Sequence, residues 1–275
     1  MRSAHESRRG CEKLPYHHGE DHLQSVASAP PLRAVAIVPT YNEIENLAPL
    51  VEQLLGLRAG LGVIVVDDNS PDGTGRLADE LAARHHGVQV IHRPGKLGLG
   101  TAYKAGFARA LAVASPLVIT MDADFSHDPR FIPAMLAAAA KYDVVIGSRY
   151  VRGGGSEGCT LPRIALSRGA NLFAKTLLGL RASDCTAGFR CYRRQVLERI
   201  DLDRIYSEGY SFLIEMLYWV QRAGFTVGEV PILFANRRRG ASKISRREIT
   251  RAMATVLRLW SGRQPGGSPG RKPAR

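Results

Sequence analysis

The sequence lacks the features of a disulfide-stabilised, zinc-binding or membrane-spanning protein. Its 275 residues include only four cysteines, and no two of them have CxxC spacing. We therefore expect neither a zinc site nor a disulfide framework, and the thiols should be reduced, as in a cytosol. No apolar run approaches the length of a membrane span, and the polar segment 1–26 lacks the apolar core of a signal peptide.

Acidic residues are also scarce relative to basic ones. Lys+Arg number 38 against 25 for Asp+Glu, which gives a formal net charge of +13. This excess favours an anionic partner such as nucleic acid, a membrane surface or a phosphorylated ligand, with a solvated basic surface as the alternative. Helix-turn-helix, RNP-like and zinc-finger patterns are all missing, so we expect no nucleic-acid partner. Much of the excess positive charge lies in the termini and in the segment RRRGASK. The composition of segments 1–32 and 263–275 predicts a disordered extension and a disordered basic tail.

Apolar runs alternate with helical patterns through the first 150 residues. Short apolar runs bounded by turn signals predict buried strands. The expected strands cover 35–38, 63–66, 88–93, 117–121 and 143–150, with helices at 45–55 and 76–85, after Gly100 and after Pro129. This alternation predicts an α/β protein with an open, mostly parallel sheet flanked by helices on both faces.

The second half of the chain is less regular. Helices are expected at 162–178, 209–223 and 246–260, with short strands at 186–194 and 226–234. We expect one large domain over 33–245 and an amphipathic helix over 246–262. On this helix Ile249, Met253, Val256, Leu257 and Trp260 share one face. That face either covers the core or lies on an anionic membrane, and the sequence leaves the two open.

Five polar clusters each follow one of the predicted strands. They are TYNE, DDNSPDG, HRPGK, DADFSHD and GSRY. Ligands of open parallel sheets bind outside the carboxyl ends of the strands. Because the clusters share that edge, they predict one site rather than five separate loops.

Asp122 and Asp124 form a DxD after the fourth strand. Side chains two residues apart in an extended segment point to the same side, so these carboxylates repel each other unless a cation or basic group lies between them. A hard divalent cation suits carboxylate oxygens, and Mg²⁺ usually shares its shell with substrate phosphates and water. The pattern favours a metal that bridges a nucleotide diphosphate, with helix capping before Pro129 as the alternative.

Basic side chains predict a second, phosphate-binding part of the site. Arg149 ends the fifth strand, and Arg163 and Ser167 share a helix face at i,i+4 spacing. The segment RRRGASK adds Arg237 and Lys243. Guanidinium groups bind phosphate through paired hydrogen bonds. The sequence therefore predicts two phosphorylated ligands, one carried by a metal and one by arginine.

A family resemblance covers residues 34–260. The motifs PTYNE, DDNSPDGT, KLGLGTA, MDADFSHDP, GSRY, SRGAN, DCTAGFR, GEVPI and RRRGASK, in this order, resemble those of the family 2 glycosyltransferases. Within that family they are most similar to the dolichol-phosphate (polyprenol-phosphate) mannosyltransferases. DDNSPDGT, GLGTAY and SRGAN carry this finer likeness, while PTYNE and DxD mark the wider family. The resemblance implies a GT-A catalytic domain over 33–245, with a Rossmann-like sheet and a nucleotide-sugar site at its carboxyl edge.

The resemblance also implies roles for individual donor-side residues. Asp122, Asp124 and Ser126 would hold Mg²⁺ or Mn²⁺ with the GDP diphosphate, although some family members have Gln at the position of Ser126. The full set implied for the nucleotide sugar is Pro39, Tyr41, Glu43, Asp68, Asp122, Ala123, Asp124, Ser126, Arg149, Arg237 and Lys243.

On the acceptor side, Arg149, Arg163 and Ser167 match positions that would receive a lipid phosphate, and Asp122, Asp124 and Arg149 are the implied catalytic residues. The implied reaction moves mannose from GDP-mannose to a polyprenyl (dolichyl-type) phosphate, with inversion to a β-linked product. Such an enzyme would be cytoplasmic and peripheral at the cytoplasmic face of a membrane, docked directly or through a membrane-anchored partner protein.

Two enzymatic alternatives stay open. One changes only the donor, to a UDP-linked glucose or aminosugar. The other is a transferase that acts on polysaccharide. It would need a carboxylate base to activate a hydroxyl acceptor, for which Asp184 and Glu215 are candidates.

Overall fold

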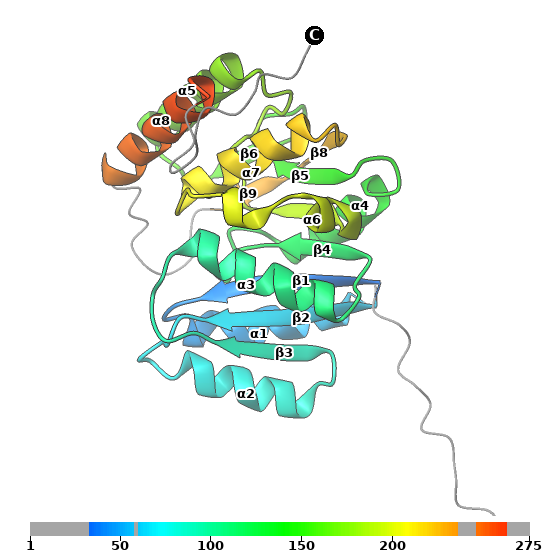
Figure 1. Cartoon of the computed structure of the whole chain (residues 1–275). Coiled ribbons are helices and arrows are strands. Elements are labelled where there is room, and N and C mark those ends of the chain that lie inside the picture. The colour runs from blue at the N-terminus through cyan, green and yellow to red at the C-terminus, as the bar shows by residue number, and fades with distance from the viewer. Residues whose placement is uncertain (1–32, 58–59, 236–245, 263–275) are drawn as a thin grey trace, which may run out of the picture. The chain divides into compact units, whose positions relative to one another are not determined.

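A computed structural model describes residues 33–57, 60–235 and 246–262, with the side chains of 246–249 left out (Figure 1). The expected extension 1–32, the tail 263–275, and Arg237 and Lys243 of the RRRGASK segment lie outside the described residues. Within the described part, no helix is both long enough and apolar enough to span a bilayer.

The core of the fold is a seven-stranded mixed sheet in the order β3-β2-β1-β4-β7-β5-β8. Its strands are β1 (Ala34–Thr40), β2 (Leu61–Asp67), β3 (Val88–His92), β4 (Leu117–Thr120), β5 (Val144–Ser148), β7 (Arg190–Arg193) and β8 (Val227–Pro231). Only β7 runs against its neighbours, β4 and β5. The predicted α/β architecture with a mostly parallel sheet is confirmed.

Helices cover both faces of this sheet because its central strands are apolar on both sides. Along β1, Val35 and Ile37 belong to one buried cluster, and Ala36 and Val38 to the other. The first cluster contains side chains of α3 (Leu99–Ala112), α6 (Arg194–Arg199) and α7 (Tyr210–Arg222). The second contains side chains of α1 (Ile44–Gly56), α2 (Thr74–Arg84) and α4 (Ile132–Ala138), the last preceded by the 3-10 turn Pro129–Phe131.

The strand predicted at 226–234 is two strands in different sheets. β8 ends at Pro231, which has no N–H to continue the ladder. The next residue, Ile232, is buried, donates its N–H to Ser148 O and accepts from Gly155 N–H, so the chain bends there. It continues as β9 (Leu233–Ala235), which pairs with the short strand β6 (Gly155–Glu157) in a second sheet. The strand predicted at 186–194 is shorter, because β7 covers only Arg190–Arg193 and α6 begins at Arg194. Neither β6, α6 nor the 3-10 turn Leu202–Arg204 was predicted from the sequence.

Two long helices, α5 (Leu161–Leu178) and α8 (Arg246–Trp260), lie against each other beyond the sheet edge (Figure 1). The predicted bounds of α8 are correct. The apolar side chains of α8 fall into two groups. Val256 and Leu259 are buried, whereas Met253, Leu257 and Trp260 are 48%, 47% and 65% exposed. The helix therefore covers the core with one part of its apolar surface and leaves the other part in contact with solvent.

Three of the four cysteines lie in the described residues. Cys159, Cys185 and Cys191 are free thiols. Burial raises the pKa of Cys185 and of Cys191 to about 12, so both remain protonated near neutral pH.

The packing of α3 on the sheet gives a stability prediction. A Cβ at Gly106 would overlap Ile37 Cγ2, which is fully buried, whereas a Cβ at Gly169 of α5 would meet no atom within 4 Å. Gly106→Ala should lower the free energy of unfolding by about 1–3 kcal/mol. Gly169→Ala should raise it by about 0.5–1 kcal/mol, because alanine favours a helix. Urea unfolding of both variants tests this, and equal effects would contradict the described packing.

Candidate active site

The five polar clusters do meet at one edge of the sheet. β1, β2 and β3 are parallel, and β4 is parallel to β1. β5 runs in the same direction as β4, because β7 is antiparallel to both. The carboxyl ends Thr40, Asp67, His92, Thr120 and Ser148 therefore face the same side, as the sequence predicts.

The DxD lies in the tight turn after β4. Asp124 is buried, and its Oδ1 accepts the Ser126 N–H at 3.0 Å, while the Asp122 side chain is 28% exposed. Ser126 Oγ is buried and has no hydrogen-bond partner among the described residues. The capping role that was the alternative for this pair belongs to Asp128, which accepts the Arg130 N–H at 2.9 Å at the start of the 3-10 turn.

The buried side chain of His127 supports the backbone of this segment. It is buried, and its Nδ1 accepts the Asp122 N–H at 3.0 Å. The ring stacks on Phe189 at 5.1 Å between centroids and makes a T-shaped contact with Phe234 at 5.9 Å. His127 is thus a buried support for the backbone of Asp122, rather than a surface group.

The oxygen atoms of this turn suit a hard cation. Asp122, Asp124 and the unpartnered Ser126 hydroxyl line one cavity. No group of three His, Cys, Asp or Glu side chains among the described residues could hold a metal ion. A divalent cation bound here would therefore need further ligands from a diphosphate and from water, as Mg²⁺ commonly does.

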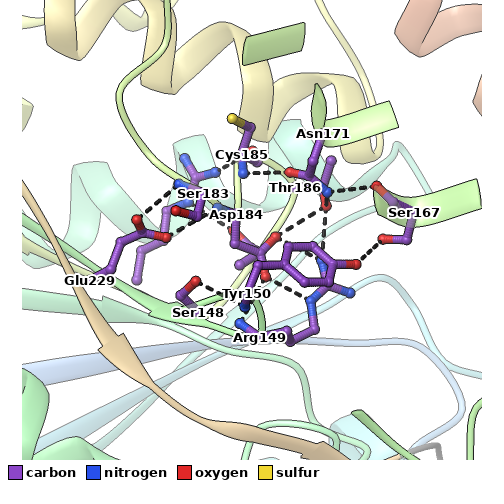
Figure 2. Close-up of polar contacts among 12 residues, drawn as sticks. Ser148, Arg149, Tyr150, Ser167, Asn171, Ser183, Asp184, Cys185, Thr186 and Glu229 are labelled. Atoms are coloured by element: carbon purple, nitrogen blue, oxygen red, sulfur yellow. Dashed lines mark hydrogen bonds and ion pairs between the residues drawn. The ribbon is translucent and has the colours of Figure 1, made fainter. Parts of the chain in front are cut away.

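Arg149 lines the same cavity and is held by a buried ion pair (Figure 2). Its Nε and Nη2 each donate to the Asp184 carboxylate at 2.7 Å, and Nη2 also donates to Thr186 Oγ1 at 2.9 Å. The Asp184 side chain is fully buried and that of Arg149 is 15% exposed. Burial alone would lower the pKa of Arg149, but the hydrogen bonds and charge of Asp184 outweigh it and raise this pKa. The guanidinium is therefore a permanent, oriented cation.

Aromatic rings and α5 complete the surroundings of Arg149. Its guanidinium lies 5.1 Å from the ring centroid of Tyr150 and 5.4 Å from that of Phe234. The Tyr150 hydroxyl donates to Ser167 Oγ on α5 at 2.7 Å (Figure 2). Arg163, one turn before Ser167, lines the cavity as well. The structure thus brings together the predicted acceptor residues Arg149, Arg163 and Ser167.

Much of the cavity wall is apolar. It includes side chains from α3, α5, α7 and α8, among them Leu99, Ile164, Phe173, Leu213 and Val256. One cavity therefore combines carboxylates, arginines and a hydrocarbon surface. This combination fits a ligand with both a phosphate and an apolar chain.

Four residues predicted for the nucleotide base do not line this cavity. Pro39, Tyr41, Glu43 and Asp68 lie instead at or near the ends of β1 and β2. Tyr41 is 37% exposed, with Lys96 Nζ 4.1 Å from its ring centroid. Asp68 pairs with Arg93 at 3.1 Å, yet burial raises its pKa above the ordinary aspartate value. Ala123, the middle residue of the DxD, is buried.

Neither candidate general base is available for that role. Asp184 is committed to Arg149. Glu215 is buried, and its carboxylate accepts from Arg258 at 2.7 Å and from the Ser207 N–H at 2.9 Å. The requirement of a polysaccharide transferase for a positioned carboxylate base is not met by either residue.

Several residues that build the site have no role in the sequence analysis. They are Tyr150, Asn171, Thr186, Arg190 and Glu229. All but Thr186 and Arg190, which share the motif DCTAGFR, come from different motifs: Tyr150 from GSRY, Asn171 from SRGAN and Glu229 from GEVPI. The family motifs therefore contain these residues, but the residues contact partners that are distant in the sequence.

Comparison with known proteins places this chain in a family. The family model described as glycosyl transferase family 2 matches residues 35–201. The chain belongs to this family, and the predicted membership is confirmed.

Two relatives are similar over most of their length. The chain is 46% identical to a polyprenol monophosphomannose synthase of Mycolicibacterium smegmatis, over 82% of this chain and 86% of the relative. It is 43% identical to an undecaprenyl-phosphate mannosyltransferase of Micrococcus luteus, over 82% of this chain and 93% of the relative.

Solved structures share the fold. Glucosyl-3-phosphoglycerate synthase from Mycobacterium tuberculosis, in complex with Mn²⁺, UDP and glucosyl-3-phosphoglycerate, superposes with a TM-score of 0.60 at 19% identity, covering 85% of this chain and 81% of that one. A mannosyltransferase from Pyrobaculum calidifontis in complex with GDP-Man and Mn²⁺ gives a TM-score of 0.50 at 18% identity, with 85% and 66% covered. These likenesses confirm the predicted GT-A fold.

The buried ion pair gives a second stability prediction. Asp184→Asn removes the charge that compensates Arg149 and should lower the free energy of unfolding by about 3 kcal/mol. The matched change Asp201→Asn, in the exposed pair with Arg204, should cost less than about 1 kcal/mol. Chemical denaturation measures both, and a cost at Asp184 no greater than at Asp201 would show that the buried pair is not a major restraint.

Proposed function

We propose that this chain is an inverting glycosyltransferase that moves mannose from GDP-mannose to a polyprenyl phosphate and releases polyprenyl-phosphate β-mannose. The observation that carries the proposal is the cavity itself, in which the DxD oxygens, three predicted phosphate-binding residues and an apolar wall line one space. The names of the two relatives at 46% and 43% identity support the same substrates.

On the donor side, Asp122, Asp124 and the unpartnered Ser126 hydroxyl would hold Mg²⁺ or Mn²⁺ together with the GDP diphosphate. Structural relatives solved with Mn²⁺ and with Mg²⁺, each alongside a nucleotide, support a metal-dependent donor site. When bound, the cation would neutralise charge on the leaving diphosphate. Pro39, Tyr41, Glu43 and Asp68 would hold the guanosine at the ends of β1 and β2. The family resemblance assigns Arg237 and Lys243, which lie outside the described residues, to the donor as well.

On the acceptor side, Arg149 and Arg163 would hold the lipid phosphate, with Ser167 as a third hydrogen-bonding group. Arg149 suits this task because Asp184 fixes the orientation of its guanidinium. Part of the guanidinium still faces the cavity, where it can bind a phosphate. The apolar side chains of α5, α7 and α8 that line the same cavity would contact the first prenyl units.

The chemistry requires no general base on the acceptor. A phosphate monoester is already ionised near neutral pH, with a second pKa of about 6. The two arginines would therefore orient a ready nucleophile toward the anomeric carbon, on the face opposite the leaving GDP. Orientation of this kind can lower a barrier by roughly 7–11 kcal/mol in favourable cases. The commitment of Asp184 and Glu215 to ion pairs agrees with this base-free mechanism.

Transfer of radiolabelled mannose from GDP-mannose to a short polyprenyl phosphate in detergent tests the proposal. We expect chloroform-soluble label with Mg²⁺ and none with EDTA. Asp124→Ala should reduce the rate roughly 100-fold or more, because it removes a carboxylate ligand of the cation that stabilises the leaving group. Asp128→Ala, which changes only the capping acid of the same segment, should retain activity.

Other outcomes distinguish the alternatives. Label from a UDP-sugar, but none from GDP-mannose, would show that the donor is a UDP-sugar. The assigned fold and acceptor would be unaffected by that result. Equal activity of Asp124→Ala and wild type would overturn the assigned metal site.

Peripheral binding to the cytoplasmic face of a membrane, directly or beside a membrane-anchored partner, fits the surface of α5 and α8. Leu161, Leu166 and Leu172 of α5 are exposed, as are Met253, Leu257 and Trp260 of α8. The two helices pack together and line the cavity, so this apolar surface adjoins the cavity proposed to hold the lipid phosphate.

Flotation with anionic phosphatidylglycerol liposomes tests the docking surface. The double variant Leu257→Gln/Trp260→Gln should bind at least about tenfold more weakly, because it loses two apolar side chains that would enter the lipid. Leu97→Gln, a change at an equally exposed leucine outside α5 and α8, is the matched control. Equal binding of all three proteins would exclude a role for the α8 surface.

A further inference from the structure

The loop 183–187 determines where Arg149 points. It lies between α5 and β7 and carries both Asp184 and Thr186, which bind the Arg149 guanidinium. The loop has no regular secondary structure, so its shape must come from side chains that bind its backbone.

Three side chains from different elements bind this loop. Glu229 of β8 accepts the N–H groups of Ser183 at 2.8 Å and Asp184 at 3.1 Å (Figure 2). Asn171 of α5 accepts the Cys185 N–H at 2.6 Å. The fully buried Arg190 donates to Cys185 O and Ala187 O, both at 2.8 Å, and to Leu213 O at 2.9 Å.

Asn171 differs from the other two because it joins both halves of the acceptor site. Its Oδ1 binds the loop backbone, while its Nδ2 donates to Thr186 Oγ1 at 3.1 Å and to Ser167 O at 2.8 Å. Thr186 in turn accepts from Arg149, and Ser167 is an assigned acceptor residue (Figure 2). A single amide thus connects the α5 backbone at Ser167 to the support of Arg149.

The helix α5 depends on this connection because it is poorly buried. Of its 18 residues, Asn171 and Ala174 are the buried ones. Leu161 and Leu172 point into solvent, with exposed fractions of 81% and 63%. The apolar side chains of α5 that pack on the core, Phe173, Ala174, Leu177 and Leu178, lie in its C-terminal half. Polar contacts such as those of Asn171 therefore add restraint to the half that carries Arg163 and Ser167, whose motion would displace them relative to Arg149.

We propose that Asn171 is a positioning residue for acceptor binding, which sets α5 and the loop 183–187 in the relative position that lets Arg149, Arg163 and Ser167 hold one phosphate. This inference rests on the proposed function and adds a residue to it. Asn171 needs no contact with substrate, because it acts through Thr186 and Arg149 on one side and through the α5 backbone on the other.

The chemistry of the site requires an amide at this position. One end must accept a backbone N–H and the other must donate to a hydroxyl and a carbonyl, and asparagine does both without charge. Aspartate would keep the acceptor but lose the donor, and it would place a further carboxylate against a loop that already carries Asp184 and binds Glu229. Asn171→Asp is therefore expected to impair acceptor use even though its size is unchanged.

The test compares Asn171→Ala and Asn171→Asp with wild type in mannose transfer to a short polyprenyl phosphate. We expect kcat/KM for the lipid phosphate to fall roughly 10- to 100-fold while KM for GDP-mannose stays unchanged. Gln221→Ala is the matched control. Its amide also binds a backbone N–H of the chain after α5, at Arg181 and 2.9 Å, but it contacts no acceptor residue. Transfer by this control should match wild type.

A double-mutant cycle tests whether Asn171 acts through Arg149. In the Arg149→Ala background, Asn171→Ala should have a clearly smaller effect than in wild type, because one of its two targets is gone. Full additivity, or an equal loss of GDP-mannose affinity and lipid use in both Asn171 variants, would overturn the inference and leave Asn171 a general stability residue. If wild type itself transfers no mannose, the proposed function fails. If wild type is active and both Asn171 variants match it, only this inference fails.

Discussion

The ion pair between Arg149 and Asp184 is the interaction on which the arrangement of the site depends. A buried carboxylate is costly without a partner, and removing either member leaves an uncompensated charge. Asp184 is fully buried and binds Arg149 through both oxygens, so the position of the loop 183–187 and the direction of the guanidinium are fixed together. The loop is held in turn by β8, α5 and β7, through Glu229, Asn171 and Arg190.

This arrangement explains how a protein with a net charge of +13 uses its few carboxylates. Asp184 and Glu215 are buried and orient the arginines with which they pair. Asp122 and Asp124 instead lie in the turn at the end of β4 and line the cavity, where a cation would compensate their charge. In the proposed function, Asp122 and Asp124 would bind one phosphate group through a metal, and Asp184 would support the binding of the other through Arg149.

Much of the fold could be predicted from local patterns. The apolar runs that became β1, β2, β4 and β5 are buried on both faces, and the polar residues after them meet at one edge because the strands are parallel. The bounds of α8 follow from its amphipathic period. These features depend on residues that are near one another in the chain, so the sequence contains their signal directly.

The parts that could not be predicted depend on distant contacts. Asp184 follows Arg149 by 35 positions, and Glu229 follows Asp184 by 45. No periodic pattern indicates that an antiparallel strand, β7, inserts between β4 and β5 and brings the loop 183–187 to the site. The division of 226–234 into β8 and β9 likewise depends on the turn at Ile232, which binds Ser148 and Gly155. The family motifs include these residues, but the residues that they contact could be identified only from the folded structure.

In the proposed function, one cavity holds a metal-bound diphosphate and a lipid phosphate side by side. The most direct measurement is a crystal structure of the protein with Mn²⁺, GDP and a short polyprenyl phosphate, with the metal located by its anomalous scattering. We expect Mn²⁺ against Asp122, Asp124 and the GDP diphosphate, and the lipid phosphate on Arg149 and Arg163 with its chain along α5 and α8. Lipid phosphate bound elsewhere, or Mn²⁺ away from the DxD, would contradict this proposal.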